Sequence, residues 1–158
     1  MNRKIRNATP VTVDGITFRS KLESNVYLYL KSKGITPQFE TERFVLTDDI
    51  PIGKIRYYDR IGRNYLRMMR RPRPITYTPD MSFTYKGYKV YVEVKGYMND
   101  VFPLKAKMFL SYLSKQPDSS RYVYAVIRSI VEIDYTLNDI DNTPNTLNNP
   151  PKSLISDH

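Results

Sequence analysis

Residues 75–95 read ITYTPDMSFTYKGYKVYVEVK, and this stretch decides the fold. It contains two runs rich in β-branched and aromatic residues, Ile75 to Tyr85 and Tyr88 to Lys95, separated by Lys86-Gly87. Two such runs joined by a short glycine-containing turn predict a β-hairpin. In the second run every other residue is a valine, which is typical of a strand that is buried on one face.

Three polar residues of this hairpin are spaced so that they can meet. Asp80 ends the motif Tyr77-Thr78-Pro79-Asp80 on the first strand, and Glu93 and Lys95 follow on the second. Side chains two apart on a strand point to the same face, so Glu93 and Lys95 look in one direction. If Asp80 lies alongside, two acids and one lysine converge. The structural alternatives are a solvated Glu-x-Lys pair and a Pro-Asp turn.

These residue types suit a hard divalent cation. Mg²⁺ prefers carboxylate and carbonyl oxygens; Asp80 and Glu93 supply two carboxylates, and the Val94 carbonyl could supply a third oxygen. Such a cation acidifies water and neutralises the charge that builds up on a phosphate under attack. A neighbouring lysine can orient the water or help to remove its proton. We therefore predict phosphodiester hydrolysis with Mg²⁺, for which Mn²⁺ is expected to substitute.

Composition excludes several other chemistries. The 158-residue chain has no Cys, and its only His is His158, so disulfides, thiolate zinc sites, cysteine catalysis and histidine catalysis are not expected. No apolar run approaches the length of a membrane span, and the basic residues 1–7 precede no hydrophobic segment. We therefore expect a soluble cytoplasmic protein with no membrane partner. One domain, 1–137, is predicted, with residues 138–158 as a flexible polar tail.

Most of the net charge of +9 lies in a basic insertion at about 48–74. Between positions 54 and 73, eight basic residues face one acid, Asp59, and tyrosines are interleaved with them. Guanidinium groups bind phosphate in a fork and rings stack on bases, so this pattern favours nucleic acid over a merely solvated basic loop. An extended hairpin or a short helix near Asn64 to Met69 would fit the segment. The predicted nucleic-acid contacts here are Lys54, Arg56, Arg60, Arg63, Arg67, Arg70, Arg71 and Arg73.

The remaining segments predict an α/β fold in which helices flank a mixed sheet of about four or five strands in the order α-β-β-β-α-β. A strand or hairpin around Asp14-Gly15 comes first, and the final strand is expected to run parallel to an earlier one across a helix. The predicted ranges are Val11 to Phe18 (strand or hairpin), Lys21 to Lys33 (helix, closed by Gly34), Gln38 to Leu46 (strand), Pro103 to Lys115 (helix, with Leu104, Met108 or Lys107, Phe109, Tyr112 and Leu113 toward the core) and Arg121 to Ile127 (strand).

Two positions have competing interpretations. Ser20 followed by Glu23 has the spacing of a capping box, so Glu23 either caps the first helix or adds a further acid to the site. Lys105 and Lys107 lie two apart on a predicted helix and therefore do not share a face. One of them is expected to contact phosphate while the other is solvated, unless both only add solubility.

The chain resembles the PD-(D/E)xK nuclease superfamily, which has the restriction-endonuclease-like fold. The matching motifs are Tyr77-Thr78-Pro79-Asp80 and Glu93-Val94-Lys95-Gly96 on the predicted hairpin, and Phe18-Arg19-Ser20-Lys21-Leu22-Glu23 at the first predicted helix. Gln38-Phe39 and Leu104-Lys105-Ala106-Lys107 are similar to a phage-encoded branch without an assigned role. The resemblance covers roughly Thr17 to Ile127, and the segment 48–74 is expanded relative to a minimal core.

This resemblance implies Mg²⁺-dependent cleavage, with Asp80 and Glu93 as ligands, Lys95 at the attacking water and Glu23 as an accessory acid. We therefore expect a DNA endonuclease of phage replication, recombination or packaging, acting inside the host cell. Substrates with two-fold symmetry would favour a homodimer. The alternatives are a catalytically inactive nucleic-acid-binding module and a phage assembly protein on the same fold.

Overall fold

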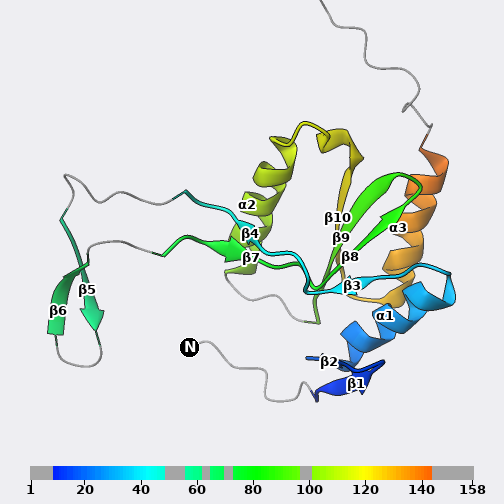
Figure 1. Cartoon of the computed structure of the whole chain (residues 1–158), viewed down its shortest axis with the longest axis horizontal. Helices are drawn as coiled ribbons and strands as arrows, with labels where there is room; N and C mark the ends of the chain where they lie inside the picture. Colours follow the sequence, from blue (N-terminus) through cyan, green and yellow to red (C-terminus); the bar gives the residue numbers. More distant parts are fainter. Residues whose placement is uncertain (1–8, 49–55, 62–64, 70–72, 97–100, 144–158) are drawn as a thin grey trace, which may run out of the picture.

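A four-stranded mixed sheet forms the centre of the computed structural model, which describes residues 9–48, 56–61, 65–69, 73–96 and 101–143 (Figure 1). Its strand order is β10-β9-β8-β3. The β9–β10 pair is parallel, as predicted, and the other pairs are antiparallel. The strands are β3 (Gln38–Phe39), β8 (Met81–Tyr85), β9 (Tyr88–Val94) and β10 (Tyr122–Ile127).

Both predicted hairpins are present. Lys86 and Gly87 join β8 to β9 with positive φ angles of 46° and 83°. Such turns match the right-handed twist of the paired strands, which explains why a glycine is needed there. The same geometry, at Asp14-Gly15, joins β1 (Val11–Val13) to β2 (Ile16–Phe18).

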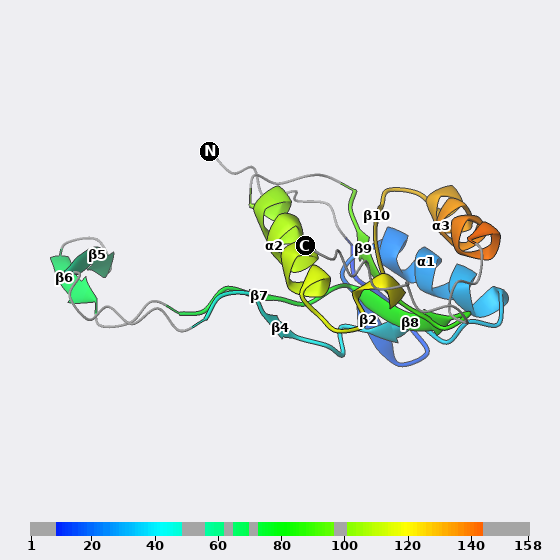
Figure 2. The ribbon, with the colours of Figure 1, turned by 90° about the horizontal axis from the view of Figure 1, so that it is seen from above.

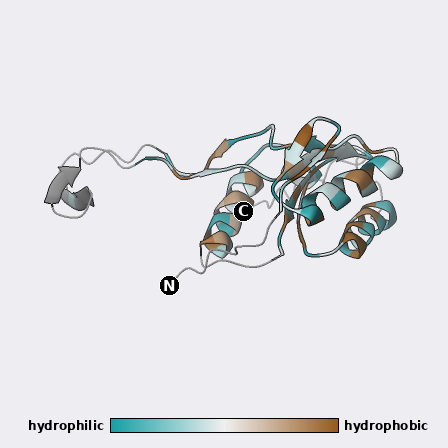
Figure 3. Cartoon of the chain, turned by 90° about the horizontal axis from the view of Figure 1, so that it is seen from below, coloured by the Kyte–Doolittle hydropathy of each residue, from teal (hydrophilic) through white to brown (hydrophobic). Residues whose placement is uncertain are grey.

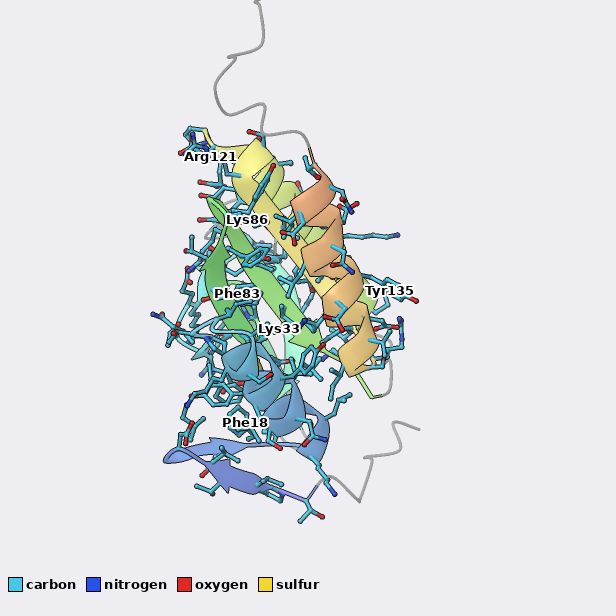
Figure 4. All side chains as sticks on the ribbon, turned by 90° about the vertical axis from the view of Figure 1, so that its right-hand side faces the viewer. Phe18, Lys33, Phe83, Lys86, Arg121 and Tyr135 are labelled. Carbon is cyan, nitrogen blue, oxygen red and sulfur yellow. The ribbon has the colours of Figure 1, made fainter. Side chains whose placement is uncertain are left out.

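Helices cover the two faces of the sheet, so the fold is α/β with three layers (Figure 2). On one face α1 (Lys21–Ser32) and α3 (Ile130–Asn142) pack over the valines of β9, and on the other α2 (Phe102–Ser114) packs over aromatic rings. A short 3-10 turn, Ser119–Arg121, leads from α2 into β10. Phe18 sits under α1, whereas Tyr135 points from α3 away from the sheet (Figure 4).

Two predicted long strands are each divided in two. The range Ile75 to Tyr85 contains β7 (Thr76–Tyr77) and β8, and Gln38 to Leu46 contains β3 and β4 (Phe44–Val45). Pro79 has no N–H to offer a ladder, and Glu40 adopts a positive φ of 48° that turns the chain. The outer pieces β4 and β7 pair with each other. Asp80 therefore lies between β7 and β8 and not within one continuous strand.

The helix α3 was not predicted, and it extends through Asn142, so the predicted flexible tail from residue 138 begins too early. Ile133, Leu137 and Ile140 recur at helical spacing and are buried in the core, so tertiary packing outweighs the poor helix propensity of the Asn and Asp residues around them. Residues 144–158 of the predicted tail lie outside the described ranges.

The core assignments for α2 need one correction. Phe109 and Leu113 are buried, as predicted, but Leu104 is 57% exposed, and the helix begins at Phe102, whose ring is buried. Hydrophobic and hydrophilic residues alternate along this helix (Figure 3), so the pattern alone left its inward face ambiguous.

The basic insertion contains an antiparallel pair, β5 (Tyr57–Ile61) and β6 (Tyr65–Met69). This confirms the extended-hairpin alternative over the described residues, and Tyr65–Met69 form a strand where a short helix was the other possibility. The pair lies apart from the central sheet (Figure 1). Among the described helices, none is long and apolar enough to cross a bilayer.

Candidate active site

A cavity of about 520 Å³ opens between the start of α1, the β7–β8 junction, the end of β9 and the start of α2. All four predicted catalytic residues line it: Glu23, Asp80, Glu93 and Lys95. Val94, the predicted third ligand, lines it as well. The tertiary structure thus brings the predicted set together.

Asp80 is fixed by the strand that it faces. Its side chain is buried, and Oδ2 accepts a 2.7 Å hydrogen bond from the Val94 backbone N–H. Oδ1 accepts a 2.9 Å bond from the guanidinium of Arg19. Burial first, and then the neighbouring Glu93 carboxylate, raise the pKa of Asp80 to about 7. The Val94 N–H and Arg19 thus hold the carboxylate in place, but they do not fully offset the free-energy cost of burying its negative charge beside Glu93.

Glu93 and Lys95 share one face of β9 and its extension, as their spacing predicts. Lys95 Nζ lies 2.5 Å from Glu93 Oε1, and it also sits 4.6 Å from the centre of the Phe102 ring. The Lys95 backbone N–H donates to the carbonyl of Ile127, the last residue of β10, so Lys95 stays hydrogen-bonded to β10 one residue beyond the end of β9. The amine is therefore held beside the acid instead of extending into solvent.

A pair of tyrosines positions the other oxygen of Glu93. Tyr77 donates its hydroxyl to Glu93 Oε2 at 2.6 Å, and its oxygen lies 2.7 Å from the hydroxyl of Tyr124 on β10. Burial and the nearby Glu93 charge raise the pKa of Tyr77, so its proton stays in the bond to the carboxylate. No role was predicted for either tyrosine. Tyr77 belongs to the motif before Asp80, whereas Tyr124 is placed only by the β9–β10 pairing.

Glu23 caps the helix and also lines the cavity. The Glu23 N–H donates to Ser20 Oγ at 3.2 Å, Ser20 Oγ donates to Glu23 Oε1 at 2.9 Å, and the Arg19 N–H donates to Oε2 at 3.0 Å. This is a variant of the capping box, because the Glu23 carboxylate accepts from the N–H of Arg19, one residue before the cap, and not from the Ser20 N–H. Both oxygens thus have partners at the helix start, so Glu23 serves the cap of α1 while it lines the cavity.

Replacing Ser20 by Ala is expected to lower the free energy of unfolding by about 1 kcal/mol, because the cap of α1 and one partner of Glu23 are lost. Urea unfolding measures this change. Ser32→Ala is a matched control in the same helix, since Ser32 Oγ only donates back to the Tyr29 carbonyl, and a change within about 0.5 kcal/mol is expected there. Equal losses in the two variants would contradict the capping role.

Arg19 and Glu40 complete the site and were not predicted. Arg19 lines the cavity and forms ion pairs with both Asp80 and Glu40. The Glu40 N–H also donates to the Asp80 carbonyl at 3.0 Å. Arg19 directly precedes the cap residue Ser20, which could have marked it, whereas nothing in the sequence around Glu40 points to this cavity.

The donor set fits a cation held by two carboxylates. Within the described ranges no three acids or histidines gather into a metal-binding group, and every buried polar side-chain atom has a partner. Mg²⁺ keeps several waters and is commonly bound through one or two carboxylates, so Asp80 and Glu93 are sufficient. The raised pKa of Asp80 indicates a place where added positive charge would be favourable.

The predicted nucleic-acid contacts divide into three groups. Lys105 lines the cavity and donates to the Thr76 carbonyl at 3.3 Å, whereas Lys107 is exposed on α2 and does not line it. Arg56 and Arg73 are exposed, and Arg60 and Arg67 belong to β5 and β6. The others, Lys54, Arg63, Arg70 and Arg71, lie outside the described ranges.

No curated protein and no solved structure matches the chain. A protein-family model does match it, over residues 3–124, which include every residue of the cavity. The description of that family names no activity, so the chemistry has to be argued from the site itself. On the extent of this match, the chain belongs to the family described as "Protein of unknown function (DUF1064)".

Proposed function

We propose that this protein is a metal-dependent DNA endonuclease that hydrolyses phosphodiester bonds with Mg²⁺, or with Mn²⁺ in its place. The observation that carries the proposal is that Asp80, Glu93 and Lys95 line one cavity, with the amine 2.5 Å from one acid. The resemblance to PD-(D/E)xK nucleases assigns these same residues. A phage origin and a role in replication, recombination or packaging belong to the proposal and rest on that resemblance alone.

Asp80 and Glu93 would hold the cation. When bound, it acidifies water and neutralises charge on the phosphate. The chain's own residues do the rest: the Val94 N–H and the Tyr77 hydroxyl keep the two carboxylates in place, and Lys95 orients the water that attacks phosphorus. In the reaction a bond forms between the water oxygen and phosphorus while a P–O bond to the leaving strand breaks. The proton of the water is lost to solvent, and the leaving oxygen takes one up from solvent. Fixed groups of this kind need little reorganisation as the transition state forms.

Affinity for DNA is assigned to the basic segment and to Lys105. The exposed Arg56 and Arg73 lie at either end of the β5–β6 region, and cationic side chains of this type bind the phosphate backbone without reading sequence. Lys105 lies inside the cavity, where it is placed to contact a phosphate near the reacting one. Lys107 is expected to be solvated.

Cleavage of supercoiled, single-stranded and four-way branched DNA tests the proposal, with Mg²⁺, Mn²⁺ or chelator present. Wild-type protein is expected to cut at least one substrate only with metal, and Lys95→Ala to cut it roughly 10²- to 10⁴-fold more slowly, because the amine beside Glu93 is lost. Lys107→Ala is the matched control, since that lysine is exposed on α2 and does not line the cavity, and the cleavage rate of this variant should stay near that of wild type.

Equal cutting by wild type and Lys95→Ala would indicate a contaminating nuclease or a wrong assignment. DNA binding that persists without cleavage in either metal, and that Asp80→Asn leaves unchanged, would favour a non-catalytic binding module. A stable oligomer in high salt that shows no preference for DNA over other polyanions would favour an assembly protein.

A further inference from the structure

Arg19 contacts Asp80, one of the two proposed metal ligands. Its guanidinium lies 2.9 Å from Asp80 Oδ1 and also pairs with the Glu40 carboxylate. The two ends of the Arg19–Asp80 contact differ in exposure: 64% of the arginine side chain is accessible, against 5% of the aspartate side chain. The acid is therefore fixed, whereas the arginine is a long side chain at the cavity mouth that can rotate.

Glu40 gives this arginine a second partner. Its φ of 48° is uncommon for a residue other than glycine, and its N–H is bonded to the Asp80 carbonyl. Unusual backbone conformations of this kind persist where the surrounding structure fixes them, and they are concentrated at functional sites. Glu40 is thus held in register with Asp80, while its own carboxylate remains partly open to solvent.

A guanidinium and a divalent cation would compete for Asp80. Two positive groups on one carboxylate repel each other, so a divalent cation that binds Asp80 weakens its pair with Arg19. The arginine end of this pair is largely exposed, so its guanidinium can leave the buried acid for solvent. Glu40 can keep the arginine at the cavity mouth after the exchange. There its planar fork matches the oxygens of a phosphate.

We infer that Arg19 is the built-in counter-ion of Asp80 in the metal-free protein and becomes a phosphate-binding residue of the site when a divalent cation takes its place. Glu40 holds the guanidinium at the cavity mouth in both arrangements. This inference rests on the proposed function and adds a substrate-positioning residue to it. It has two consequences of opposite sign: loss of Arg19 strengthens binding of the metal and weakens binding of DNA in the presence of metal.

Calorimetric titration with Mn²⁺ in the absence of DNA measures the first consequence. Arg19→Gln is expected to bind Mn²⁺ roughly two- to fivefold more tightly than wild type, because one competing charge has been removed from Asp80. Arg43→Gln is the matched control, since Arg43 is exposed, bonds Thr76 and does not line the cavity; its Mn²⁺ affinity should equal that of wild type. Arg19→Lys, which keeps the charge, should also stay near wild type.

Fluorescence anisotropy with labelled DNA measures the second consequence, the weaker binding of DNA. The measurement is made in Ca²⁺, as a non-cleaving cation, and again in EDTA. In Ca²⁺ the Arg19→Gln variant is expected to bind on the order of tenfold more weakly than wild type, whereas in EDTA the loss should be much smaller, because Arg19 then remains on Asp80. For Arg43→Gln, any change in DNA affinity relative to wild type is expected to be the same in Ca²⁺ and in EDTA. Urea unfolding verifies that each variant is folded.

Weaker or unchanged Mn²⁺ binding by Arg19→Gln, or an equal loss of DNA affinity in Ca²⁺ and EDTA, would overturn the inference while leaving the proposed nuclease standing. A wild-type protein that binds no Mn²⁺ at all would overturn both. Tighter metal binding together with a loss of DNA affinity that requires metal would support it.

Discussion

Replacing Asp80 by Asn is expected to lower the rate of DNA cleavage on the order of 10³-fold and, at the same time, to stabilise the metal-free protein above neutral pH. The two effects have one cause. Asp80 is a buried carboxylate that lies near Glu93, so its charge is useful for holding a cation and costly when no cation is present. Asn keeps an oxygen for the Val94 N–H but carries no charge.

The sign of the pH dependence follows from the direction of the shift. The folded-state pKa of Asp80, about 7, lies above the ordinary value of 3.8, so the folded protein holds this proton more tightly than the unfolded chain does. That contribution to stability is complete below about pH 4 and is lost as the pH rises through 7. Between about pH 5 and pH 8, wild-type protein in EDTA should lose about 2 kcal/mol of unfolding free energy.

Urea unfolding in EDTA across this range measures the loss. Asp80→Asn should give a nearly flat profile and should exceed wild type in stability at the alkaline end. Asp134 and Asp141 serve as a comparison for Asp80, because salt bridges lower the pKa of each of them. Their contribution to the unfolding free energy is therefore already complete at pH 5 and should not change up to pH 8. A wild-type profile that rises or stays level from pH 5 to pH 8 would contradict the burial argument.

Replacing Phe109 by Ala is expected to cost about 3–5 kcal/mol of unfolding free energy, the largest loss of stability that we expect from one substitution. The side chain is fully buried at the centre of the core on the α2 face of the sheet. Its ring centre lies 4.7 Å from that of Tyr77, 4.9 Å from that of Phe44 and 5.1 Å from that of Tyr124. Removal of the ring leaves a cavity that these rigid neighbours cannot fill.

The same substitution should also slow cleavage, because Phe109 packs against Tyr77, the hydrogen-bond donor that positions Glu93. Leu110→Ala is the control: this adjacent residue on α2 is 51% exposed, and a change within about 0.5 kcal/mol is expected. Urea unfolding and single-turnover cleavage of the two variants give the comparison. A loss below about 1 kcal/mol for Phe109→Ala would show that the α2 face is not a packed core.

Local sequence signals determined much of the fold. The Lys86-Gly87 and Asp14-Gly15 turns, the Ser20 cap of α1 and the alternation of valines in β9 were predicted because each depends on a few adjacent residues with strong conformational preferences. Breaks that depend on more distant partners were not predicted. The division of the segment around Glu40 and the whole helix α3 are fixed by pairing and burial across the fold.

The candidate site divides in the same way. The sequence by itself determined that Glu93 and Lys95 share a strand face, and the predicted hairpin and the family resemblance added Asp80 to them. Only the tertiary structure decided what surrounds them. Arg19, Glu40, Tyr77 and Tyr124 reach these residues from the start of α1, the turn after β3, β7 and β10. Strand periodicity acts over two residues, whereas hydrogen bonds and burial act between segments that only folding brings together.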